Sequence, residues 1–176
     1  MSIPTVEISN ILYATDLSEN AHHALAYAVS MAEQYRARLS LIHVLEEVLD
    51  LDEKVVGYIS GERWEEIKKG HEAEARITLT GKLKGRNTFK AVLGQINEDV
   101  RAGITEPRFE TGDILVERGN PVVEILEAAM ATHADLIVLG THGQGTFKDA
   151  MMGSTARRVL RRSKIPVLVI RLPEPT

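Results

Sequence analysis

Two glycine-containing turns near the C-terminal end of the chain have the residue types and spacing that suit a bound anion. Gly140 and Gly143 follow an apolar run. After nine further residues, Gly153 precedes Ser154 and Thr155. Backbone N–H groups can surround a phosphate only where no side chain blocks the approach, which favours glycine. A helix that begins here would add free N–H groups, its dipole and two hydroxyl donors, so the spacing predicts a phosphate-binding site.

Two common phosphate-binding motifs are absent, so this site needs a different architecture. The P-loop pattern fails because the Gly-Lys pair at 81–82 is followed by leucine and has no earlier glycine at the required spacing. The dinucleotide fingerprint fails because Gly143 and Gly145 are followed by Lys148, where a third glycine is required.

The sequence assigns no residue to catalysis and none to a metal site. It contains neither a Gly-x-Ser-x-Gly elbow nor a carboxylate cluster of the two-metal type. His22 and His23 are adjacent, so they face different directions on a helix and cannot form a two-ligand site alone. His43, His71 and His133 show no ligand spacing either. We therefore expect a binding site without an assigned catalytic or metal-ligating residue.

The pattern of apolar residues predicts strands that alternate with helices. The expected strands are 11–14, 39–45, 114–116, 135–139 and 165–170. The expected helices are 19–35, one with an apolar stripe over 89–100, one that starts at Asn120-Pro121, and 153–162. This alternation predicts an α/β, single-domain, open parallel five-stranded sheet with helices on both faces. Ligands bind such sheets beyond the carboxyl ends of the strands, where the strand order reverses.

The segment 46–108 is the least regular part of the sequence. We expect a loop over 46–61 and a helix over 62–76, supported by Glu–Lys and Glu–Arg pairs at favourable helical spacing. Gly70, Gly81 and Gly85 leave open whether the segment forms one long helix or two.

Length, composition and charge indicate one cytoplasmic domain. The 176 residues, with a mass of 19.5 kDa, suffice for a single domain over 1–176 with a substantial core. The formal net charge is −4 and there is no cysteine, so we expect neither a nucleic-acid partner nor a disulfide framework. There is no N-terminal leader pattern, and no apolar run approaches the ~18 residues of a membrane span, so we expect no membrane partner.

One local exception to the acidic balance lies near the end of the chain. Five cations fall within eight residues: Arg157, Arg158, Arg161, Arg162 and Lys164. Because a run of like charge usually forms a solvated helix face, we expect that role here.

The glycine pattern and its flanking segments together resemble a known family. Gly140, Gly143, Gly153 and Ser154 meet the pattern Gly-x-x-Gly, nine residues, Gly-Ser. Other landmarks are the opening strand and turn at 10–18, the strand at 41–44, Gly-Asn-Pro at 119–121, the strand at 134–140 and the closing strand at 165–170. The chain thereby resembles the nucleotide-binding branch of the universal stress protein family, although 46–108 matches poorly. The resemblance implies a Rossmann-like fold of the adenine nucleotide alpha hydrolase type.

By that resemblance, ATP would lie across the carboxyl ends of the strands. Asp16 would accept hydrogen bonds from the ribose, Val44 would meet adenine through its backbone, and the glycines would let backbone approach the phosphates. The implied nucleotide-binding residues are Ala14, Thr15, Asp16, Val44, Gly140, Thr141, His142, Gly143, Gly153, Ser154 and Thr155. Several have ordinary alternatives: Asp16 as a turn or helix-cap aspartate, Val44 as a buried strand residue, the glycines with Ser154 as a tight turn and an N-cap serine, and His142 as a solvated loop side chain.

The resemblance also implies a function: a cytoplasmic ATP-binding protein with a regulatory or stress-response role, which forms a homodimer through its last strand. Mg²⁺ would accompany the phosphates with few protein ligands. Two alternatives stay open, namely a slow ATPase or nucleotidyl-transferring enzyme on the same fold, and a nucleotide-free interaction protein. The retained glycine pattern favours binding, and hydrolysis would need a positioned water that no residue here is assigned to hold.

Overall fold

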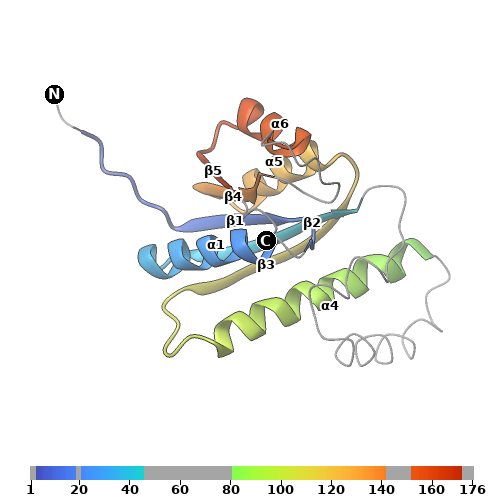
Figure 1. Ribbon diagram of the computed structural model, residues 1–176, viewed down its shortest axis with the longest axis horizontal. Helices are drawn as coiled ribbons and strands as arrows, with labels where there is room; N and C mark the ends of the chain where they lie inside the picture. Colours follow the sequence, from blue (N-terminus) through green and yellow to red (C-terminus); the bar gives the residue numbers. More distant parts are fainter. Residues whose placement is uncertain (1–2, 19–20, 46–80, 142–151, 172–176) are drawn as a thin grey trace.

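The computed structural model describes residues 3–18, 21–45, 81–141 and 152–171, which form one sheet and its covering helices (Figure 1). The strands are β1 (Asn10–Thr15), β2 (Arg38–Leu45), β3 (Glu110–Arg118), β4 (Leu136–Gly140) and β5 (Val167–Ile170). The helices are α1 (Ala21–Tyr35), α4 (Gly81–Ala102), α5 (Pro121–Ala131) and α6 (Ser154–Arg162). All strand pairings are parallel, in the order β3-β2-β1-β4-β5.

Helices cover both faces of the sheet, and each face has its own cluster of buried side chains. α1 and α4 pack against the face that contains Ile11 and Tyr13 of β1. α5 and α6 pack against the opposite face, which contains Leu12 of the same strand (Figure 1). The alternation follows from the two-residue period of a strand. The predicted fold class is therefore confirmed.

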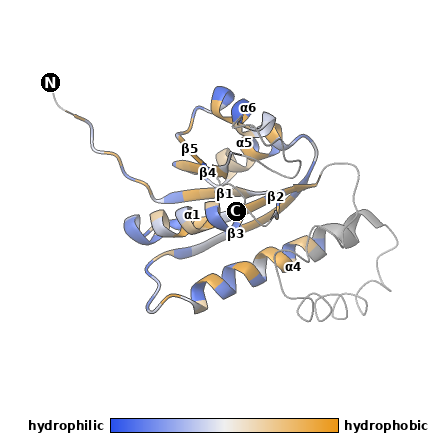
Figure 2. Cartoon of the chain, in the orientation of Figure 1, coloured by the Kyte–Doolittle hydropathy of each residue, from blue (hydrophilic) through white to orange (hydrophobic). Residues whose placement is uncertain are grey.

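β1 and β4 are largely apolar because helices cover both faces of the sheet. Ile11, Leu12 and Tyr13 are all buried, although they point to opposite sides of the sheet. Figure 2 shows hydrophobic residues along β4 and β5 and a largely hydrophilic α6. None of the helices within the described ranges is both long enough and apolar enough to cross a membrane.

Asp135 fastens the start of β1 to the start of β4. Its Oδ2 accepts the Ser9 and Asn10 N–H groups at 2.8 and 2.9 Å. Its own N–H donates to the Asn10 carbonyl at 2.8 Å. These bonds set the two strands level at their N-terminal ends, and Ile11 lies in register with Leu136. The hydrogen bonds of Asp135 at the N-terminal ends therefore fix the register of β1 and β4 up to their carboxyl ends.

The structure moves the predicted start of two strands by more than one residue. β3 begins at Glu110 rather than at Ile114, because this edge strand starts with polar residues that an apolar pattern does not mark. β5 covers Val167–Ile170 rather than 165–170. Pro166 lies just before it, and the Pro166 carbonyl still accepts the Ile137 N–H at 3.0 Å.

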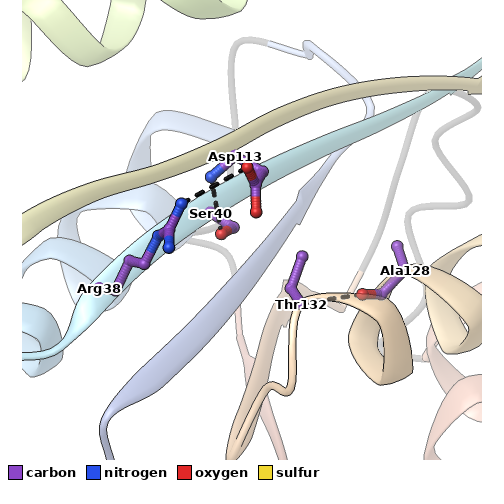
Figure 3. Close-up of polar contacts among 5 residues, drawn as sticks. All are labelled: Arg38, Ser40, Asp113, Ala128 and Thr132. Carbon is purple, nitrogen blue, oxygen red and sulfur yellow. Dashed lines mark hydrogen bonds and ion pairs between the residues drawn. The ribbon is translucent and has the colours of Figure 1, made fainter.

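The predicted helices are confirmed where the structure describes them. The stripe expected in α4 is buried over residues 89–96, and the helix is continuous from its start at residue 81. In α5, the predicted N-cap Asn120 accepts the Val122 N–H at 3.0 Å. At the other end of α5 the Thr132 hydroxyl donates to the Ala128 carbonyl at 2.8 Å (Figure 3). The expected loop at 46–61 and helix at 62–76 lie outside the described residues.

β2 and β3 change register between Leu39 and Leu41. Leu39 pairs with Thr111, whereas Leu41 pairs with Ile114, so β3 carries one extra residue between these pairs. Gly112 lies in this bulge. A Cβ on it would lie 2.9 Å from the Leu39 carbonyl oxygen, closer than real Cβ atoms approach. The bulge therefore requires glycine.

Side chains on both strands hold the bulge in place (Figure 3). The Ser40 hydroxyl oxygen accepts the Asp113 N–H at 2.9 Å and is mostly buried. The Asp113 carboxylate also forms an exposed ion pair of 3.5 Å with Arg38. Because exposed pairs contribute little to stability, we expect the Ser40 bond to matter more.

Gly112→Ala should lower the free energy of unfolding by about 1–3 kcal/mol, because overpacking against a backbone carbonyl cannot be relieved by a rotamer change. Gly94→Ala is the matched control. Its added Cβ would meet only Ile114 Cδ1 at 3.8 Å, and alanine favours the helix by up to ~1 kcal/mol. Urea unfolding gives the free energy of unfolding of both variants. Equal effects of the two substitutions would contradict the close approach of Gly112 to the Leu39 carbonyl.

Candidate functional site

The carboxyl ends of all five strands lie at one edge of the sheet because the strands are parallel. β1 stands between β2 and β4. The chain proceeds from β1 to β2 on one side and returns to the other side at β4, so the strand order reverses between β1 and β4. Ala14 is in register with Leu139 across this junction. Asp16, which follows β1, and Gly140, which ends β4, therefore lie at neighbouring strand ends.

Val44 lies at the same edge on the other side of β1. Thr15 is in register with His43, so Val44 is one residue further along β2. Its side chain is half-buried and packs against the α5–α6 cluster. The structure thus brings the predicted adenine, ribose and phosphate positions to one edge. His142 and Gly143 lie outside the described residues.

Asp16 lies in a turn that its own side chain helps to form. Its Oδ1 accepts the Ser18 N–H at 3.2 Å and the Ser18 hydroxyl at 2.8 Å. Thr15 Oγ1 accepts the Leu17 N–H at 3.1 Å. Leu17 is buried and has a φ of 60°, which a non-glycine residue adopts only under strong local constraint. The turn interpretation of Asp16 is therefore correct, and a ribose contact would be an additional role.

His43 and Tyr13 hold the backbone on either side of this turn. His43 Nδ1 lies 2.9 Å from the Thr15 carbonyl, and the ring packs on Phe89 of α4 with centroids 4.7 Å apart. The Tyr13 hydroxyl donates to the carbonyl of Ala21, the first residue of α1, at 2.7 Å. Both side chains are buried. The loop that carries Asp16 is thus anchored at each end.

The start of α6 is fastened to the end of β4. The Gly153 N–H donates to the Thr141 carbonyl at 2.7 Å, and the Thr141 N–H donates to the Ile170 carbonyl at 2.8 Å. Gly153 is the N-cap of α6 and forms no side-chain cap bond. Ser154 is exposed and Thr155 is half-buried, and both lie in the first turn of α6. The first N–H groups of a helix lack intrahelical partners and are available to an anion.

The backbone conformation does not require glycine at the two described positions of the motif. Gly153 has φ −55° and ψ 156°, which any residue can adopt. Gly140 belongs to β4 and is therefore extended. Of the glycines in the described ranges, Gly119 is the one with a positive φ, of 151°.

The end of β3 contributes to this edge, and the sequence interpretation gave it no role. Glu117 is in register with Val44, and the Gly119 N–H donates to the Leu45 carbonyl at 3.2 Å. α5 begins just beyond, capped by Asn120. A second helix start therefore lies at the same sheet edge. The Gly-Asn-Pro turn at 119–121 was the signal that could have placed it there.

The described part of the site contains no arrangement for metal binding. Across the residues that the structure describes, no group of three or more His, Asp or Glu side chains is placed to hold a metal ion. The geometry instead combines backbone donors at β4 and α6 with one carboxylate at Asp16. Such a set can bind a ligand that carries both phosphate and hydroxyl groups.

The profile of the universal stress protein family matches residues 7–171. The chain belongs to the universal stress protein family. A universal stress protein of Thermus aquaticus is 32% identical over 161 residues, which cover 92% of this chain and 97% of the relative. Universal stress protein MJ0577 of Methanocaldococcus jannaschii is 29% identical over 171 residues, 95% of this chain and 97% of its own.

Solved structures show the same fold. The MJ0577 structure superimposes with a TM-score of 0.64 at 27% identity and covers 97% of this chain and 100% of that one. A universal stress protein solved in complex with cAMP gives a TM-score of 0.57 at 21% identity, over 94% of this chain and 98% of that one. At 21% identity, the similarity to the cAMP complex shows a shared fold and nothing more.

Asp16→Ala should lower the free energy of unfolding by about 1 kcal/mol without any ligand, because Ser18 loses its hydrogen-bond acceptor. Ser18→Ala should lower the free energy of unfolding by less, since it removes only the hydrogen bond from the Ser18 hydroxyl to Asp16. The two effects should overlap by about 0.5 kcal/mol or more in the double variant. Strict additivity in urea unfolding would contradict the proposed turn.

Proposed function

We propose that this universal stress protein is a cytoplasmic ATP-binding protein with a regulatory or stress-response role. The bond between the Gly153 N–H and the Thr141 carbonyl carries the proposal, because it holds the start of α6 beside the end of β4. Asp16 follows the neighbouring strand. Donors suited to phosphates and an acceptor suited to hydroxyl groups therefore lie at adjacent strand ends.

In this proposal the nucleotide lies along the edge of the sheet. Adenine meets the backbone at Val44, between the ends of β2 and β3. The ribose hydroxyls donate to Asp16 beyond β1. The phosphates contact the backbone at Gly140 and the start of α6, where Ser154 and Thr155 supply hydroxyl donors. Ala14, Thr15, Thr141, His142 and Gly143 complete the proposed set.

The glycines support this placement because the backbone alone does not explain them. At Gly153, serine, asparagine or aspartate would cap α6 better than glycine does. At Gly140, the strand conformation accepts any residue. A missing side chain at both positions is explained by the close approach of a ligand to the backbone. Their positions at the strand reversal identify where that ligand would lie.

The proposed role is binding rather than turnover. Phosphoryl transfer depends on a positioned water or hydroxyl and on groups that neutralise developing charge. No side chain of the described site is arranged for the first task, since the Asp16 carboxylate is committed to Ser18 through Oδ1. Mg²⁺ would accompany the phosphates with few protein ligands.

Gly153→Ser should separate nucleotide binding from stability. The wild-type protein should gain ~2.7 kcal/mol of stability at ATP concentrations a hundredfold above Kd, seen as a rise in Tm. The variant should lose most of this rise because its side chain enters the phosphate position. Without ATP it should melt at the same temperature or higher, since serine is the better N-cap.

Gly103→Ser is the matched control, because its added Cβ would make only ordinary contacts of 3.5 Å with the Asp99 and Val100 carbonyls. This variant should keep the full ATP response. Thermal unfolding with ATP, ADP and cAMP compares the ligands. An ATP response that survives in Gly153→Ser would contradict the proposed phosphate position.

The proposal includes a homodimer through β5. The two edge strands differ in character. β3 carries the charged residues Glu110, Asp113, Glu117 and Arg118, which oppose edge-to-edge pairing. β5 consists of valine, leucine, valine and isoleucine, three of them only half-buried. An apolar edge of this kind is stable in water only when it is covered.

Light scattering should give twice the monomer mass of 19.5 kDa. Val169→Lys, on β5, should shift the protein toward the monomer, because it places a charge in the proposed interface. Thr111→Lys, on β3, is the control and should leave the mass unchanged. A wild-type monomer would refute this interface.

A further inference from the structure

α6 carries a concentration of positive charge that neither the fold nor the proposed nucleotide site uses. The cations of the α6 basic patch are Arg157, Arg158, Arg161, Arg162 and Lys164. All five are exposed. The whole chain has a net charge of −4, so removing these five positive charges leaves −9 for the remainder. The patch is therefore a local positive surface on an acidic protein.

None of the described acidic side chains neutralises the patch. Elsewhere, Arg38 pairs with Asp113 at 3.5 Å and Arg108 pairs with Glu33 at 3.6 Å. Over the described residues, no ion pair involves a member of the α6 basic patch. Its cations are thus available to a partner.

Helix stability does not account for the arrangement. The helix dipole favours Arg161 and Arg162 in the last turn of α6, but its effect is confined to that turn. Arg157 lies four residues before Arg161, and Arg158 four before Arg162. Like charges at this spacing repel and destabilise a helix. The sequence therefore keeps an arrangement that costs stability, as a binding surface can.

The shape and composition of the patch favour a protein partner. Arg158, Arg161 and Arg162 line a hollow of about 220 Å³. Guanidinium groups bind carboxylates in a bidentate geometry, so three of them around one hollow suit a segment with several Asp or Glu side chains. The rest of the chain is acidic and repels a polyanion long enough to reach beyond the patch, whereas a short acidic segment can lie within it.

We propose that the α6 basic patch docks a short segment of a partner protein that is rich in Asp or Glu side chains. The carboxylates pair with the three arginines that line the hollow. The patch occupies the C-terminal half of α6 and Lys164 just beyond it, whereas the proposed phosphate site uses the first turn of α6, so this inference does not depend on nucleotide binding.

The test uses a short fluorescent peptide rich in Asp and Glu, added to the full chain without nucleotide. Fluorescence anisotropy should show binding that weakens as salt increases. Arg158→Glu with Arg162→Glu should lower the affinity about tenfold or more, which corresponds to loss of strong charge-assisted contacts. Arg36→Glu with Lys90→Glu changes the net charge equally at exposed positions and should keep the affinity.

Leu160→Ser is a second control, because Leu160 is two residues from both Arg158 and Arg162 and does not share their face of the helix. It should keep the affinity for the peptide. Circular dichroism and light scattering confirm that each variant keeps its fold and oligomeric state. The proposal is overturned if both charge-reversed pairs weaken the peptide equally. It is also overturned if tripolyphosphate, duplex DNA or phosphatidylserine vesicles bind the patch more tightly than the peptide does.

Discussion

The Asp135 carboxylate joins the starts of β1 and β4, and the geometry of the functional edge depends on this junction. Two N–H groups of the incoming chain donate to one oxygen, at 2.8 and 2.9 Å. Hydrogen bonds to a charged acceptor are stronger than neutral ones, so the register of the two strands is well defined. Since both strands rise by ~3.3 Å per residue, fixing their starts also fixes their ends. Ala14 and Leu139 are level near the carboxyl edge for that reason, and Asp16 and Gly140 follow just beyond them.

A second set of contacts ties helices to the carboxyl ends of the strands. α6 is tied to β4 through Gly153 and Thr141, and Thr141 is tied in turn to the end of β5. On the other side of β1, His43 packs between the Thr15 carbonyl and Phe89 of α4. The turn that carries Asp16 is therefore supported by β2 and α4. A site built on strand ends and helix starts is well suited to hold a ligand in one position.

Local patterns predicted much of this structure. The apolar runs gave the strands, and Asn120 with Pro121 gave the start of α5, because caps and periodicity act over a few residues. The start of β3 was missed because Glu110, Thr111 and Asp113 are polar residues of an edge strand. The contacts of Asp135 with Ser9, and of His43 with Thr15, join residues far apart in the chain, and no local pattern reports them. The glycine motif indicated a ligand, and only the backbone angles showed that the conformation at Gly153 does not require glycine.

The central claim is that the carboxyl edge of the sheet binds an adenine nucleotide. The most direct measurement is mass spectrometry of the small molecules released when protein purified without added nucleotide is denatured. The account predicts that the wild-type protein releases ATP in stoichiometric amounts and that Gly153→Ser, purified in the same way, releases none. A wild-type protein that releases no adenine nucleotide, and that shows no heat of binding when ATP is titrated in, would contradict it.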